Sequence, residues 1–78
     1  MPQQVYLYPE GFEGYRISDV DDASNPKYYG FLNKDGAWCI TKEDTTNKTY
    51  RYIVGSSGYS ASWTDRVNLS YTYFSDVF

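Results

Sequence analysis

Aromatic side chains set what this chain can fold into. Tyrosine occurs ten times, phenylalanine four times and tryptophan twice in 78 residues, whereas histidine is absent and cysteine occurs once. A domain of this length buries only about 60% of the surface that its unfolded chain exposes. Each large ring can bury roughly 150–250 Å², so the rings must supply much of the core. We therefore expect a thin aromatic core that is stabilised further by association with itself or with a partner.

Residues 27–54 have the pattern of an antiparallel β meander. An aromatic run comes first, and two stretches follow in which apolar and polar side chains alternate with the period of two typical of strands. Gly36 ends a Lys-Asp-Gly sequence between the first two stretches, where we expect it to adopt the positive φ that a tight hairpin requires. The predicted strands are residues 27–33, 37–43 and 49–54.

Alternation within the later strands assigns side chains to faces. Trp38 points to one face and Cys39 to the other, so we expect one buried face and one wet face. Tyr50 and Tyr52 share a face in the next strand, where aromatic side chains stabilise a small sheet. The residues expected to be structural are Gly36, Trp38, Tyr50, Tyr52 and Trp63.

Residues 62–68 predict one short helix. Ser62 is a suitable N-cap, and Trp63 and Val67 supply an apolar side. A helix of about two turns is unstable alone in water, so Trp63 must pack against the sheet. Residues 71–74 return to strand patterning. The predicted fold class is mostly β, with a small antiparallel sheet or meander of about 4–6 strands and one short helix near residues 62–68.

The first 26 residues are less regular than the rest. Residues 5–8 and 14–18 are candidate strands, separated by a turn and followed by a polar loop. These strands either complete the sheet or belong to an N-terminal arm that packs elsewhere, and the sequence leaves both alternatives open. We expect a single domain over residues 1–78, with the meander core at 28–78.

Side chains that carry chemistry are few. Without histidine, a serine or cysteine nucleophile lacks its usual base and zinc lacks its usual ligands. Asp19 and Asp21 begin like an EF-hand loop, but Ser24 and Gly30 stand where that loop needs glycine and glutamate. An irregular calcium site at Asp19, Asp21 and Asp22 is the alternative to a solvated turn. We expect no enzymatic activity, no cofactor and no metal.

Charge and hydropathy limit the partners. The net charge is −3 and no basic patch is visible, which argues against nucleic acid. Neither a long apolar run nor a signal peptide is found, so we expect no membrane contact and no export. Exposed rings pack against other proteins or stack on sugars, so we expect protein contacts, with a glycan-binding module that uses exposed tyrosine and tryptophan as the alternative. The interface candidates are Val5, Tyr6, Leu7, Tyr8, Tyr15, Tyr59, Val77 and Phe78.

The order of hairpin, tryptophan-containing helix and aromatic last segment is carried by residues 28–40, 49–52 and 62–69. With these segments, residues 28–78 resemble short tyrosine-rich proteins, mostly of unassigned function, encoded among the structural genes of tailed bacteriophages. The resemblance implies a virion component: a decoration, adaptor or tail- or fibre-associated subunit. Such a subunit contacts copies of itself or other virion proteins and is assembled in the host cytoplasm. No catalytic or ligand motif comes with the resemblance.

Overall fold

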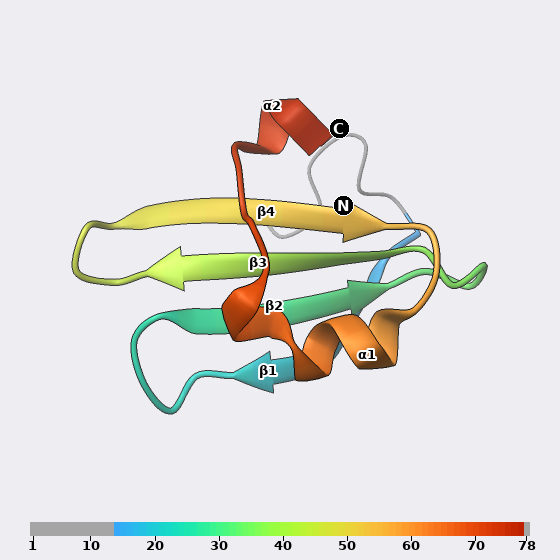
Figure 1. Cartoon of the computed structure of the whole chain (residues 1–78), viewed down its shortest axis with the longest axis horizontal. Helices are drawn as coiled ribbons and strands as arrows, with labels where there is room; N and C mark the ends of the chain where they lie inside the picture. Colours follow the sequence, from blue (N-terminus) through green and yellow to red (C-terminus); the bar gives the residue numbers. More distant parts are fainter. Residues whose placement is uncertain (1–13, 78) are drawn as a thin grey trace, which may run out of the picture.

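An antiparallel sheet forms the body of the protein, and its strands follow one another in chain order (Figure 1). The computed structural model describes residues 14–77. Each strand pairs with the next in the order β1-β2-β3-β4. The strands are β1 (Arg16–Asp21), β2 (Lys27–Leu32), β3 (Trp38–Asp44) and β4 (Thr49–Gly55). The predicted mostly-β fold with a small antiparallel sheet is confirmed.

Strands β2, β3 and β4 begin and end within one residue of their predicted bounds. β1 differs, because it runs to Asp21 and so takes in part of the predicted polar loop. Asp21 pairs with Tyr28 and Val20 with Tyr29, while a β-bulge lies between Ile17 and Asp19. Pairing with an aromatic strand therefore outweighs the low strand propensity of aspartate. The candidate strand at residues 5–8 lies outside the described residues.

The predicted helix is displaced and divided. Helix α1 (Tyr59–Thr64) begins before Ser62, whose N–H already donates to the Gly58 carbonyl at 3.1 Å. Gly58 precedes the helix with a left-handed φ of 74°, so Ser62 is not the N-cap and that prediction was wrong. After Asp65 the chain makes a separate 3-10 turn (Arg66–Asn68). Tyr59 stacks on Trp63 with the ring centroids 6.2 Å apart, and both rings pack on the buried cluster of the sheet. This packing explains why the helix starts at Tyr59.

The predicted strand at residues 71–74 is also wrong. Thr72 forms a single bridge with Tyr52, and the chain then turns into helix α2 (Phe74–Val77). Phe74 packs edge-on against the Tyr52 ring, with the two ring centroids 5.1 Å apart. In Figure 1 the chain leaves the 3-10 turn in front of the sheet, crosses β3 and β4 and reaches α2 beyond β4. Packing of Phe74 against Tyr52 therefore ends the strand after one bridge.

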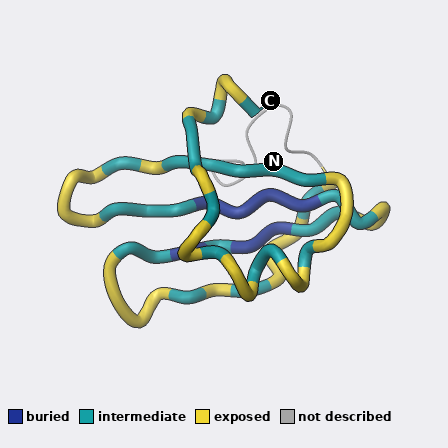
Figure 2. Tube along the Cα trace, viewed as in Figure 1, coloured by how far each residue is buried: buried dark blue, intermediate teal, exposed yellow. Residues whose placement is uncertain are grey.

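Both faces of β3 are buried, as the dark segments of β2 and β3 in Figure 2 show. Tyr28, Trp38 and Ile40 form a cluster on the face that carries α1. Phe31 and Cys39 form a second cluster on the opposite face, packed by side chains that include Tyr15, Tyr52 and Val54. The expectation that the Cys39 face is wet was therefore wrong at the centre of the sheet, because neighbouring rings cover that face too.

Replacing Gly36 with valine should lower the free energy of unfolding by about 1–2 kcal/mol, because a β-branched residue is strained at positive φ. Gly36 has a φ of 93°, and a Cβ added there would meet nothing within 4 Å, so only backbone strain enters. Lys34→Ala is the control, since Lys34 is exposed and its 3.4 Å ion pair with Asp35 is solvated. Urea denaturation measures both variants. Equal midpoints would show that this turn tolerates any residue.

Candidate protein-binding surface

Both edges of the sheet carry features that hinder addition of another strand. On β4, Tyr52 and Thr72 exchange two backbone hydrogen bonds of 2.7 and 2.9 Å, which occupy part of the outer edge. On β1 the bulge between Ile17 and Asp19 interrupts the strand, and charged side chains flank the bulge. Bulges and charges are common means by which proteins prevent edge-to-edge pairing. Binding through a face of the sheet is therefore favoured over strand addition.

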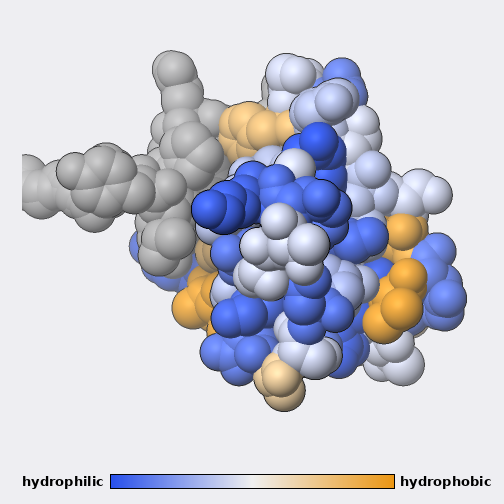
Figure 3. Space-filling view, turned by 90° about the vertical axis from the view of Figure 1, so that its left-hand side faces the viewer, coloured by the Kyte–Doolittle hydropathy of each residue, from blue (hydrophilic) through white to orange (hydrophobic). Residues whose placement is uncertain are grey.

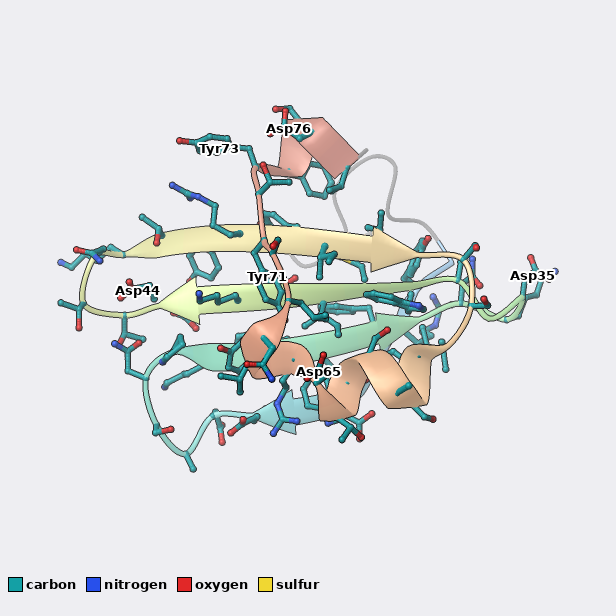
Figure 4. All side chains as sticks on the ribbon, viewed as in Figure 1. Asp35, Asp44, Asp65, Tyr71, Tyr73 and Asp76 are labelled. Atoms are coloured by element: carbon teal, nitrogen blue, oxygen red, sulfur yellow. The ribbon has the colours of Figure 1, made fainter. Side chains whose placement is uncertain are left out.

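The face that carries α1 is closed by a polar network. Arg66 donates through Nε and Nη2 to one oxygen of Asp21, at 3.1 and 2.9 Å, and its guanidinium carbon lies 4.5 Å from the centroid of the Trp63 ring. Tyr59 donates its hydroxyl to Asp19 at 2.7 Å, while burial raises the pKa of Tyr59. Figure 4 shows Tyr71 across the middle of the sheet on this same side. The network links β1 to the helix region.

This network also accounts for two of the three acidic residues of the alternative calcium site at Asp19, Asp21 and Asp22. Asp19 accepts from Tyr59, and Asp21 accepts from Arg66. Over residues 14–77 no group of three or more cysteine or acidic side chains is arranged to hold a metal ion. Asp19 and Asp21 therefore have a structural role as hydrogen-bond acceptors.

The face opposite α1 exposes large apolar side chains. Ile17 is 49% exposed, Val20 52% and Tyr50 50%. Ile17 pairs with Phe31 and Val20 with Tyr29, so the bulge brings both β1 side chains onto this face although they are three residues apart in sequence. In Figure 3 the end of the molecule is mostly hydrophilic, and hydrophobic residues gather in separate patches towards its sides. We call Ile17, Val20, Tyr29, Glu43 and Tyr50 together the open face.

At one end of the open face, two tyrosines share one carboxylate. Tyr29 donates its hydroxyl to Glu43 Oε1 at 2.7 Å, and Tyr50 donates to Glu43 Oε2 at 3.0 Å. The three side chains come from β2, β3 and β4, and Glu43 and Tyr50 are direct cross-strand partners. We call this group the Tyr29–Glu43–Tyr50 cluster.

The hydrogen bonds of the cluster keep its carboxylate ionised. Donation from Tyr29, and then from Tyr50, lowers the pKa of Glu43. The same bond to Glu43 raises the pKa of Tyr29 to about 12, and the Tyr50 pKa is raised for the same reason. Lys27 is the cross-strand partner of Glu43, yet among residues 14–77 no cation lies within ion-pair distance of this carboxylate. The cluster therefore presents an oriented negative charge between two rings.

Three of the residues predicted to be at an interface are partly buried by contacts within the chain. Tyr15 packs on the Phe31 and Cys39 cluster, and Tyr59 lies between Trp38 and Trp63. Val77 is half-buried in α2. The remaining interface candidates lie outside the described residues; they are Val5, Tyr6, Leu7, Tyr8 and Phe78.

The residues expected to be structural divide into two groups. Trp38 and Tyr52 pack in the two clusters, and Trp63 is half-buried under Arg66. Tyr50 lies instead on the open face, half exposed. Cys39 is fully buried, and burial raises the pKa of its thiol to about 12, so it is a protonated packing residue.

Sequence reasoning missed the Tyr29–Glu43–Tyr50 cluster, although a signal for part of it was present. Glu43 and Tyr50 flank the gap between the predicted strands 37–43 and 49–54, so a hairpin there brings them close to each other, and in the structure they are direct cross-strand partners. The Arg66 pair with Asp21 spans 45 residues and carries no comparable local signal.

Comparison of the chain with protein-family models, with curated proteins and with solved structures finds no match in any of the three. In the part of the chain that the structure describes, no helix combines the length and the apolar character needed to cross a membrane. Functional inference therefore depends on the surface itself.

Proposed function

We propose that this chain is a non-enzymatic structural or assembly protein that acts through protein–protein contacts made by the open face. The observation that carries the proposal is the exposure of Ile17, Val20 and Tyr50, each about half accessible, on one face of a sheet whose edges hinder strand addition. Large apolar and aromatic side chains gathered on a small domain are typical of protein interaction sites.

The energetic argument is that this surface is favourable to cover. Burial of apolar surface contributes roughly 25 cal/mol per Å², and tyrosine combines a large ring with a polar tip that keeps a hydrogen bond at an interface. Val20 lies beside Tyr29 across the β1–β2 pair, so an apolar partner would touch β1 and β2 together. Contact with a partner would also add to a core that is thin for a domain of this size.

The setting we propose is a bacteriophage virion, with the chain as a decoration, adaptor or tail- or fibre-associated subunit. This setting rests on the resemblance of residues 28–78 to tyrosine-rich proteins of phage structural genes. A particle subunit occurs in many symmetry-related copies, so weak contacts at each copy add up. The partner is then a second copy of this chain or another virion protein.

Val20→Asp should weaken association about tenfold or more, because a charge would be placed inside the contact. Sedimentation of the purified chain at micromolar concentration measures this effect, together with mass spectrometry of purified particles for copy number. Val67→Asp is the matched control, since Val67 is 68% exposed but lies in the 3-10 turn, away from the open face. A chain that stays monomeric and is absent from the particles would contradict the proposal.

A glycan-binding module is the second candidate. The observation in its favour is that the exposed Tyr50 ring stands beside the Glu43 carboxylate, since rings stack on sugars and carboxylates accept sugar hydroxyls. Trp38 is buried and Trp63 is half-buried against Tyr59, so neither indole is as accessible as Tyr50. Glycan-array binding by a monomeric chain that Val20→Asp leaves unchanged would favour this candidate over the first.

A further inference from the structure

The protein already contains one site in which arginine is bound by rings and a carboxylate. On the α1 face, the Arg66 guanidinium carbon lies 4.5 Å from the Trp63 ring centroid and 5.9 Å from that of Tyr28. The same guanidinium donates two hydrogen bonds to Asp21. Arg51 likewise lies 4.3 Å from the ring centroid of Tyr73. Rings from β2, from α1 and from the segment before α2 thus already contact a guanidinium in this protein.

The Tyr29–Glu43–Tyr50 cluster lies on the opposite face and, like the Arg66 site, combines a carboxylate with aromatic rings. It contains a carboxylate whose two oxygens are each held by a phenol hydroxyl, and two rings that border this carboxylate. An ionised carboxylate has about four acceptor positions, and the two phenols occupy two of them. Within residues 14–77, the structure places no guanidinium at this cluster.

We infer that the Tyr29–Glu43–Tyr50 cluster receives an arginine side chain of the partner protein, which rests on the proposed function of the open face. The partner's guanidinium lies against the Tyr50 ring and donates to the remaining acceptor positions of Glu43. Its chain then continues over Val20, which is 52% exposed, so the partner segment carries an apolar residue next to the arginine.

Charge and geometry favour arginine over lysine here. Guanidinium is planar and weakly hydrated, stacks on aromatic faces and donates from several N–H groups at once, whereas an ammonium is a compact, strongly hydrated charge. Lys27 is the cross-strand partner of Glu43 but does not come within ion-pair distance, so this lysine does not take the remaining acceptor positions of the carboxylate. The net charge of −3 also attracts a basic partner segment.

The inference is tested by titrating the labelled full chain with two short peptides and recording backbone amide NMR spectra. One probe is acetyl-Leu-Arg-Leu-amide, and the other replaces arginine with citrulline, which has nearly the same shape but no charge. The arginine peptide should give saturable shifts at Glu43, Tyr50 and Val20, and affinity should fall roughly threefold to tenfold with citrulline.

Variants of the chain locate the effect. Glu43→Gln keeps an acceptor for one phenol but removes the charge, and Tyr50→Leu keeps an apolar side chain but removes the ring, so each should weaken binding of the arginine peptide by a similar factor. Asp35→Asn is the matched control, because it also removes one carboxylate charge. Asp35 lies at a hairpin tip, at the opposite end of the sheet from Asp44, which is next to Glu43 in sequence (Figure 4). This control variant should leave the affinity unchanged.

Three results would overturn the inference: equal binding of the citrulline peptide, shifts that map away from the open face, or equal affinities of Glu43→Gln and the unaltered chain. None of these results bears on the proposed function. If Val20→Asp still disrupts association while the arginine peptide fails, the open face is a protein contact without arginine recognition. If association itself is absent, the proposed function fails whatever the peptides do.

Discussion

Trp38→Ala is expected to lower the free energy of unfolding by about 3–5 kcal/mol, which is comparable with the whole stability of a domain this small. Trp38 is only 5% exposed and packs with Tyr28 and Ile40 in the cluster beneath α1. Its ring also meets Tyr59 at a centroid distance of 6.5 Å. Truncation would therefore leave a cavity between the sheet and α1. The variant should be largely unfolded at room temperature.

Circular dichroism and urea denaturation check this expectation, with Trp38→Phe as the control. Phenylalanine keeps a buried ring but loses the hydrogen bond from Trp38 Nε1 to the Ser57 carbonyl, which is 2.6 Å long. We expect this milder variant to lose about 1–2 kcal/mol and to remain folded. A Trp38→Ala variant that unfolds at the same urea concentration as the unaltered chain would show that the cluster is not the main core.

The sequence predicted those elements whose boundaries are set by residues close together in the chain. The strands β2, β3 and β4 were predicted within one residue, because alternation and turn residues both act over short distances. The conformation of Gly36 was predicted for the same reason. The start of α1 was not, since it is set by the left-handed Gly58 and by the Tyr59–Trp63 stack on the sheet, and the second of these depends on tertiary packing.

Contacts between distant segments explain the other differences. The strand expected at residues 71–74 stops after Thr72 because Phe74 turns to pack on Tyr52, which is far away in sequence. Asp21 lies in a strand instead of a loop because it pairs with Tyr28 and binds Arg66. For the candidate surface, the sequence showed that tyrosines are abundant but not which carboxylate they bind. Tyr29 and Glu43 come together only through the register of β2 and β3.

Gly55→Ala is expected to lower the free energy of unfolding by about 2–3 kcal/mol through overpacking. Gly55 is the cross-strand partner of Trp38, and a Cβ at Gly55 would lie 2.3 Å from Trp38 Cζ2 and 2.6 Å from Trp38 Nε1. The indole has little room to move, because it is buried and its Nε1 is bonded to the Ser57 carbonyl. The added methyl group must therefore displace either the ring or the end of β4.

A double-mutant cycle with Trp38→Phe tests this mechanism directly. The smaller ring lacks the indole atoms closest to the Gly55 position, so Gly55→Ala should destabilise the Trp38→Phe background by at least about 1 kcal/mol less than the unaltered chain. Urea denaturation of the four proteins measures the coupling. If Gly55→Ala has the same effect in both backgrounds, the ring is not what excludes a side chain at Gly55. The cost of Gly55→Ala would then come from the backbone conformation at Gly55 and not from the Trp38 ring.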